Sequence, residues 1–222
     1  MPACFTPSGL NNKLIDETQL IKKLYGTPGA CSLAVHIALH EAGLTFDYVR
    51  VDLRTRQAED GRNLDELNSK GYVPALELED RQMLTEVPVL LQYIAELAPE
   101  KGLAPPAGTL SCYRMQEWLS FTNSELHKGF GPLFMPGAGE EAKTQSRARV
   151  LQRLTWVDAQ LAGQPHLVGE QFTVADVYLF VVASWTRFVG IDISEMTRLG
   201  PYLARIARRP AVVAAMGAEG LM

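Results

Sequence analysis

The alternation of hydrophobic and polar positions predicts a mixed α/β structure in the first half of the chain. Residues 19–26 and 46–53 alternate as strands do, whereas residues 31–43 between them have apolar positions at helical spacing. Gly43 ends this expected helix, because glycine readily adopts the left-handed conformation that closes many helices. A helical connection between two strands implies that they pair in parallel.

Two more strands and a second helix complete the expected first domain. Residues 73–86 read as two short strands around a turn, and residues 87–98 return to helical spacing. A connection this short implies an antiparallel hairpin. The polar segment 54–71 has only weak helical content. We therefore expect residues 20–100 to form one domain, a mixed four-stranded sheet with helices on both faces.

The second half of the chain is helical in pattern. The segment 99–109 is rich in proline and reads as a linker. The stretches at helical spacing that follow are residues 110–129, 140–163, 173–188 and 199–217. The sequence therefore predicts an all-α domain over residues 101–222. Thr173 and Asp176 have the spacing of a capping box at the start of one of these helices.

Composition narrows the classes of function. The chain has 222 residues and a formal net charge of −4, so we do not expect a general nucleic-acid surface. No stretch approaches the roughly 20 apolar residues of a membrane-spanning helix. Residues 1–19 lack the basic start and apolar block of a secretory signal, and we expect them to form a mobile extension. Three widely separated cysteines favour neither a disulfide framework nor a metal site, and they suit the reducing cytoplasm.

Cys31 is the first candidate for chemistry. It follows a proline-glycine turn and stands at the expected start of the helix at residues 31–43. Unpaired N–H groups and the helix dipole at such a position lower a thiol pKa and favour a thiolate, either of Cys31 or of a bound thiol ligand. Buried structural cysteines are also common. The position alone leaves both interpretations open.

Two further segments carry candidate features. Val73-Pro74 precedes an expected strand, where proline removes one hydrogen-bond donor and keeps Val73 extended. Glu86 lies at the turn into the helix at residues 87–98, whose first N–H groups can hold a carboxylate ligand while Glu86 accepts from a ligand ammonium group. Taken singly, such a proline more often only starts a strand, and such an acid more often only complements the helix dipole.

In order and spacing, the motifs together resemble the glutathione S-transferase family, and most closely its bacterial beta class. The matching motifs are PGACSLA at residues 28–34, VPAL at 73–76, TE at 85–86, ELHKG at 125–129 and FTVADVYLF at 172–180. The resemblance extends from Leu20 to the C-terminus. It implies a thioredoxin-like first domain with a cis proline at Pro74, followed by the all-helical domain.

The resemblance also implies roles for individual residues. Cys31 and His127 would be catalytic. Cys31 would face the glutathione sulfur and form a mixed disulfide with it, whereas His127 would stabilise a thiolate as imidazolium or donate a hydrogen bond to it. The residues implied to bind glutathione are Arg56, Val73, Pro74, Glu86, Val87, Ser120, Ser124 and Lys128.

The resemblance implies which part of glutathione each residue would contact. Three of these residues depart from the family pattern. The backbone of Val73 would pair with the cysteinyl part, and Glu86 with the amide of Val87 would hold the γ-glutamyl end. Val87 stands where serine is usual, so it lacks a hydroxyl. Ser120 stands where asparagine is common. Arg56, near the glycyl carboxylate, replaces a lysine and keeps the charge.

The implied function is conjugation of reduced glutathione to apolar electrophiles in detoxification, by a cytoplasmic homodimer. Glutathione would be a co-substrate, and no further cofactor is expected. Lowering its thiol pKa by two units from about 8.5 corresponds to roughly 2.7 kcal/mol of thiolate stabilisation. Two alternatives stay open: a glutathione-dependent thiol–disulfide oxidoreductase with Cys31 as nucleophile, and a non-catalytic ligand-binding or interaction protein with the same fold.

Two other patterns do not support a site. GAGEEA at residues 137–142 is similar to a dinucleotide-binding fingerprint, but no strand precedes it and its glutamates would repel a pyrophosphate. His36 and His40 have a metal-capable spacing, but the pattern offers no third ligand. We therefore expect neither a dinucleotide nor a metal.

Overall fold

A five-stranded sheet forms the centre of the first half in the computed structural model, which describes residues 20–222. The strands are β1 (Ile21–Gly26), β2 (Asp47–Asp52), β3 (Gln57–Ala58), β4 (Ala75–Leu78) and β5 (Met83–Thr85), in the spatial order β3-β2-β1-β4-β5. β1 and β2 are parallel and the other pairs are antiparallel. The mixed sheet is confirmed, but the expected number of four strands is wrong. The additional strand, β3, is only two residues long and too short to leave an alternating pattern. The extension expected at residues 1–19 lies outside the described residues.

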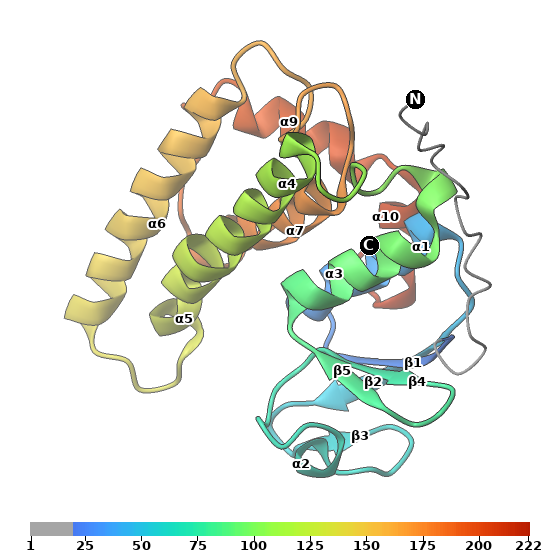
Figure 1. Ribbon diagram of the computed structural model, residues 1–222. Coiled ribbons are helices and arrows are strands. Elements are labelled where there is room, and N and C mark those ends of the chain that lie inside the picture. The colour runs from blue at the N-terminus through green and yellow to red at the C-terminus, as the bar shows by residue number, and fades with distance from the viewer. Residues whose placement is uncertain (1–19) are drawn as a thin grey trace, which may run out of the picture.

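Helices cover both faces of this sheet, as expected. α1 (Ser32–Ala42) and α3 (Val87–Leu97) lie on one face, and α2 (Leu64–Leu67) lies on the other (Figure 1). Apolar side chains divide accordingly: Leu24 and Leu76 belong to the large core with α1 and α3, and Val51 belongs to a smaller core with α2. Gly43 ends α1 in the left-handed conformation at φ 69°.

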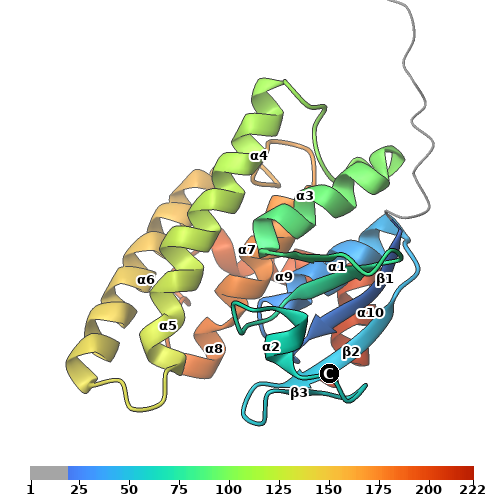
Figure 2. The ribbon, with the colours of Figure 1, turned by 60° about the horizontal axis from the view of Figure 1, so that its bottom comes forward.

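The second half contains helices only. They are η2 (Pro99–Lys101), α4 (Leu110–Phe121), η3 (Thr122–His127), α5 (Lys128–Phe134), α6 (Glu140–Gln160), α7 (Val174–Ser184), α8 (Thr186–Val189), α9 (Leu199–Ala207) and α10 (Pro210–Ala218). α7 is buried over nearly its whole length and packs against α1, α3 and α4. α10 returns to pack against α1, so that the C-terminus lies beside the first domain (Figure 2).

The expected helix over residues 110–129 is interrupted. Between α4 and α5 the backbone forms the π-helix η3, whose wider turn spans six residues. Such turns often occur at functional sites. This one carries Asn123, Ser124 and His127.

The capping box at the start of α7 is confirmed, and its acid has further partners. Asp176 is fully buried and accepts hydrogen bonds from the N–H of Thr173 at 2.8 Å and of Leu167 at 2.9 Å. It also accepts one from the Tyr202 hydroxyl at 2.9 Å. One buried carboxylate thereby ties α7 to the preceding loop and to α9.

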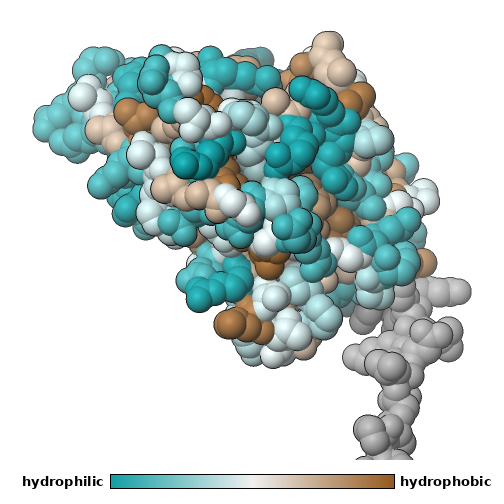
Figure 3. Space-filling model, turned by 90° about the horizontal axis from the view of Figure 1, so that it is seen from above, coloured by the Kyte–Doolittle hydropathy of each residue, from teal (hydrophilic) through white to brown (hydrophobic). Residues whose placement is uncertain are grey.

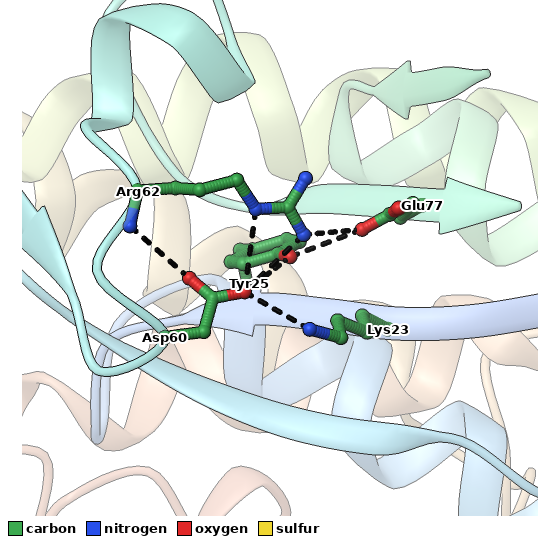
Figure 4. Close-up of polar contacts among 5 residues, drawn as sticks. All are labelled: Lys23, Tyr25, Asp60, Arg62 and Glu77. Carbon is green, nitrogen blue, oxygen red and sulfur yellow. Dashed lines mark hydrogen bonds and ion pairs between the residues drawn. The ribbon is translucent and has the colours of Figure 1, made fainter. Parts of the chain in front are cut away.

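A polar network fastens the segment between β3 and α2 to the sheet (Figure 4). The buried Tyr25 hydroxyl lies 2.8 Å from Asp60 Oδ2 and 3.0 Å from Glu77 Oε2. Arg62 donates to Glu77 at 2.5 Å, and Lys23 donates to Asp60 at 3.0 Å. The cations offset the two carboxylates, so a loop without a large core of its own is held in a fixed place.

The surface is mainly polar on the face that Figure 3 shows, with apolar residues in small separate patches. Within residues 20–222, no helix combines the length and the apolar character needed to cross a membrane.

Candidate functional site

A cleft of about 610 Å³ lies between the β1–α1 loop and the helical half. The first domain contributes Pro28, Gly29, Ala30, Cys31, Leu53, Tyr72 and Val73. The helical half contributes His127, Gly131, Phe134, Trp185, Phe188 and Leu221. The cleft therefore joins the cysteine motif and the histidine motif, which stand far apart in the sequence.

Side chains of the helical half hold the loop that carries Cys31. The carboxylate of Glu219, buried at the end of α10, accepts the N–H of Gly29 at 2.9 Å. The indole N–H of Trp185 donates to the carbonyl of Gly29, also at 2.9 Å. Gly29 has φ +71°, a conformation that favours glycine, and Leu221 packs beside it. Both backbone groups of Gly29 are thus fixed by the other domain.

His36 has a structural partner in the same cluster. Its Nδ1 donates to the second oxygen of Glu219 at 2.8 Å, and both side chains are buried. Its ring stacks on His40 with centroids 5.1 Å apart. Among residues 20–222, no group of three histidine, cysteine, aspartate or glutamate side chains is placed to hold a metal ion.

Cys31 caps the N-terminus of α1, but its thiol is buried. It is only 8% exposed, and its Sγ donates to the Val73 carbonyl at 3.5 Å. Burial raises the pKa of the Cys31 thiol to about 12, although the N–H groups of Cys31 and Ser32 and the charge of Lys128 act to lower it. The helix N-terminus thus acts in the expected direction, but the expected low pKa of the Cys31 thiol is wrong for the free protein, because desolvation outweighs the N–H groups.

The Val73-Pro74 bond is cis, as the resemblance implied for this position. Val73 is buried in the smaller core and lines the cleft next to Cys31. An extended ligand lying along this edge can pair with the Val73 backbone.

His127 belongs to a partly buried chain of hydrogen bonds. Its Nδ1 lies 2.7 Å from the Tyr178 hydroxyl, which donates to Asn123 Oδ1 at 3.0 Å. Because a hydroxyl has one proton, Nδ1 must donate to Tyr178, and this leaves Nε2 of the neutral ring as an acceptor. Burial, and after it the charge of Lys128, lowers the pKa of His127 to about 4. The free protein therefore does not hold the imidazolium, which was one of the two roles that the resemblance implied for His127.

Glu86 lies at the N-cap of α3 with φ 75°, next to the cleft. Its Oε1 accepts hydrogen bonds from Lys70 Nζ at 2.8 Å and from the Tyr72 hydroxyl at 2.5 Å. These bonds hold the pKa of Glu86 below its usual range. Sequence reasoning missed both partners. The only feature of the sequence that could have indicated Lys70 and Tyr72 was their position just before Val73-Pro74.

Four further expected residues are not among those that line the cleft. Arg56 forms an ion pair with Asp65 of α2. Ser120 and Ser124 are exposed, and the Ser124 hydroxyl donates to the Ser120 carbonyl at 3.0 Å. Lys128 is exposed, and its charge lowers the pKa values of Cys31, His127 and Glu86. The roles of Arg56, Ser120, Ser124 and Lys128 in binding stay predictions.

An aromatic wall was also missed. Phe134 and Trp185 pack edge to face with ring centroids 5.6 Å apart, and Phe188 lines the cleft beside them. Phe134 and Phe188 are exposed, whereas Trp185 is buried. In a sequence, aromatic residues at helical spacing have the pattern of ordinary core residues, so the pattern does not distinguish residues that line a cleft from residues of the core.

Two family models match the chain: the N-terminal domain of glutathione S-transferase over residues 29–97 and the C-terminal domain over residues 121–210. Glutathione S-transferase GstA of Escherichia coli O157:H7 is 42% identical over 199 residues, covering 90% of this chain and 99% of that protein. The beta-class enzyme of Sphingomonas chungbukensis has a TM-score of 0.88 at 50% identity, covering 90% of this chain and 100% of its own. A sphingomonad glutathione S-transferase complexed with glutathione has a TM-score of 0.87 at 48% identity, with the same coverage.

The Glu219 contacts predict a stability cost for Glu219→Ala. The substitution leaves two buried donors, the Gly29 N–H and His36 Nδ1–H, without an acceptor. We expect the free energy of unfolding to fall by about 3 kcal/mol and the Gly29 amide to exchange its hydrogen faster. Urea denaturation and hydrogen exchange measure these effects. Glu195→Ala, at an exposed acid, is the control and should change stability by less than about 0.5 kcal/mol. Equal effects of the two substitutions would contradict this account.

The low pKa of His127 predicts a pH dependence of stability. Between about pH 6.5 and about pH 4 the unfolded chain binds a proton at His127 and the folded protein does not, so stability falls as the pH falls. On going from neutral pH to about pH 5 the loss from this residue is about 2 kcal/mol. His127→Gln removes the site, so the variant should lose less stability than the wild type over this range. Denaturation series with equal slopes for both proteins would show that the folded pKa is not depressed.

Proposed function

The chain belongs to the glutathione S-transferase family, and on this basis we propose that the cleft binds reduced glutathione beside Cys31 and joins its sulfur to an apolar electrophile. One observation carries the proposal. Cys31 at the start of α1, the cis Val73-Pro74 bond and His127 face one apolar cleft. A tripeptide thiol and an apolar second substrate can therefore lie side by side, which lowers the entropic cost of their reaction.

The first domain offers matching groups for an extended tripeptide. The backbone of Val73 pairs with the cysteinyl residue, and the start of α3 with Glu86 holds the γ-glutamyl end. This places the thiol of glutathione close to Cys31 Sγ. The similar sphingomonad enzyme is complexed with glutathione, which supports glutathione as the ligand of this chain.

The chemistry takes place at the sulfur of glutathione. Among residues 20–222 no group donates to His127 Nε2, so it can accept a hydrogen bond from the glutathione thiol. The thiol proton passes through it to water as the thiolate forms, because a ring with a pKa of about 4 does not keep the proton near pH 7. Tyr178 keeps the ring oriented, because its buried hydroxyl accepts from Nδ1. The thiolate then attacks the electrophilic carbon, forming a carbon–sulfur bond as the leaving group departs. Lys128 adds positive charge next to the thiolate.

Cys31 is an auxiliary in this proposal rather than the nucleophile. Its raised pKa keeps the thiol protonated near neutral pH, so it can donate a hydrogen bond to the glutathione thiolate. Thiol–disulfide exchange needs a thiolate. The burial of Cys31 thus favours conjugation over the oxidoreductase alternative.

The electrophile lies against the aromatic wall. Phe134, Trp185 and Phe188 line the helical side of the cleft, and the rings of Phe134 and Phe188 are exposed. Apolar aromatic electrophiles fit this lining, because they bury surface without leaving polar groups unpaired. This substrate choice is consistent with a role in detoxification.

A second copy of the chain would cover a groove between α4 and α6. The groove has a volume of about 830 Å³ and contains Trp118, Phe121 and Trp156, whose rings pack together. Trp156 is 44% exposed, and exposed aromatic clusters often mark interfaces. We place this homodimer in the cytoplasm, where reduced glutathione and free cysteines such as Cys31 and Cys112 are stable.

Conjugation assays distinguish the two roles of Cys31. With chlorodinitrobenzene as the electrophile, we expect Cys31→Ala to lower kcat/KM by less than about tenfold, because the thiol supplies at most one hydrogen bond. His127→Gln should lower it by about a hundredfold, because the proton acceptor is lost. Cys112→Ala is the control for loss of a buried thiol. If Cys31→Ala removes activity while glutathione binding measured by calorimetry persists, Cys31 is the nucleophile.

The homodimer proposal predicts that Trp156→Glu shifts the protein toward monomers. A charge buried in an apolar interface is costly, so the sedimentation velocity should change at micromolar concentration while the helical content stays the same. Gln145→Glu, on the same helix outside the groove, is the matched control. A wild type that sediments as a monomer would exclude this interface.

A further inference from the structure

A pocket of about 400 Å³ contains the charged residues of the polar network that Figure 4 shows. None of its lining residues lines the cleft that carries Cys31. Four cationic side chains share the pocket with two carboxylates, although the whole chain has a formal net charge of −4. The pocket therefore holds a local excess of positive charge. Its lining residues are Lys22, Lys23, Asp60, Arg62, Glu77 and Arg81.

Both carboxylates of the pocket already have cationic partners. Asp60 Oδ2 accepts hydrogen bonds from Lys23 at 3.0 Å and from Arg62 Nη2 at 3.2 Å. Glu77 is buried, and its Oε2 accepts from Arg62 Nη2 at 2.5 Å. One lysine and one arginine thus neutralise the two acids, and the other two cations of the pocket account for the excess charge.

Those two cations, Lys22 and Arg81, are unpaired. Neither side chain forms a hydrogen bond or an ion pair with another residue of the range 20–222. Asp80, next to Arg81 in the turn between β4 and β5, accepts instead from the N–H and the side-chain amide of Gln82. Lys22 is half-buried and Arg81 is exposed. Two positive charges in one pocket are therefore available to a ligand.

An irregularity in β1 brings neighbouring lysines into the same pocket. Successive side chains of a regular strand point to opposite faces of the sheet. The pairing of β1 with β4 shifts register between Ile21 and Lys23, so Lys22 is an additional residue on its strand. Both lysines line the pocket. Such bulges often redirect a side chain toward a site.

The paired cations also have protons left to donate. Arg62 uses Nε and Nη2 for its carboxylate partners, and among residues 20–222 its Nη1 has no acceptor. Lys23 uses one of its three ammonium protons, for Asp60. The guanidinium of Arg62 lies over the Tyr25 ring, 4.8 Å from its centroid. Its carboxylate partners and this ring hold the guanidinium in place before a ligand arrives.

The free charges and donors fit the phosphate group of a small molecule. A phosphate monoester carries about 1.5 to 2 negative charges at pH 7, which matches two unpaired cations, whereas a carboxylate carries one. Guanidinium and ammonium groups are common partners of phosphate oxygens. An extended polyanion would also meet the acidic remainder of the protein, so the pocket favours a compact ligand.

We infer that this pocket binds a small organic phosphate. Lys22 and Arg81 neutralise the phosphate group, while Arg62 Nη1 and Lys23 donate further hydrogen bonds to its oxygens. The rest of the pocket accommodates the organic part of the ligand. Since the cleft beside Cys31 has other lining residues, glutathione and the phosphate can be bound at the same time.

Calorimetric titration of the intact protein with glycerol 3-phosphate, at constant ionic strength, tests the inference. We expect saturable binding of one molecule per chain, and none of glycerol. Lys22→Met and Arg81→Met should each weaken binding by about tenfold, the loss of one charge-assisted contact. Both substitutions break no ion pair within residues 20–222, so the variants should fold, which thermal unfolding checks. No saturable binding, or equal binding by wild type and both variants, would make the inference wrong.

Two controls distinguish this pocket from other sources of binding. Lys143→Met removes a lysine from a surface ion pair with Glu140 and should leave the affinity unchanged. Equal weakening by this variant would indicate general attraction to positive charge and contradict the inference. Saturating glutathione should not displace glycerol 3-phosphate, and displacement would place the phosphate in the cleft instead. The comparison of variants does not require glutathione binding, so the inference and the proposed function can fail separately.

Discussion

The two hydrogen bonds at the backbone of Gly29 are the constraint on which the rest of the site depends. The acceptor for its N–H comes from α10 and the donor to its carbonyl from the end of α7, so the helical half fixes the loop that ends in Cys31. The same contacts close one side of the cleft with Trp185 and Leu221. Neither half of the molecule contains this site by itself, and the C-terminal turn is as important to it as the cysteine motif.

Burial at this boundary decides the charges of the two catalytic candidates. Desolvation raises the pKa of Cys31 and lowers that of His127, so both side chains are neutral near pH 7 in the free protein. In the proposed function, a neutral cleft suits an apolar electrophile and leaves the arriving thiol as the group that ionises. The charged residues Glu86 and Lys70 are more exposed, and the proposed function puts the γ-glutamyl end of glutathione beside them. The site thus divides into a dry part for the chemistry and a polar rim for recognition.

The sequence was sufficient for most of the fold because each element carries a strong local pattern. The helix ending at Gly43, the hairpin at residues 73–86 and the capping box at Asp176 are all encoded within a few residues. The two-residue strand β3 and the π-turn at His127 have no such pattern. The family resemblance of the motifs likewise placed Cys31, Val73 and His127 in one expected site. The pKa values of Cys31 and His127 depend on burial by distant segments, so the sequence could not predict them. The pairing of Lys70 with Glu86 depends on the conformation of a loop, so it could not be predicted either.

The state of the sulfur atoms tests the central claim most directly. Ultraviolet absorbance of thiolates can be followed across neutral and mildly alkaline pH, with and without glutathione, in the wild type and in Cys31→Ala. The account predicts no thiolate from Cys31 in the free protein. A thiolate band should appear when glutathione binds, at a pH below the thiol pKa of free glutathione, and it should remain in Cys31→Ala. A band at neutral pH without glutathione that disappears in Cys31→Ala would contradict the account and make Cys31 the reactive thiol.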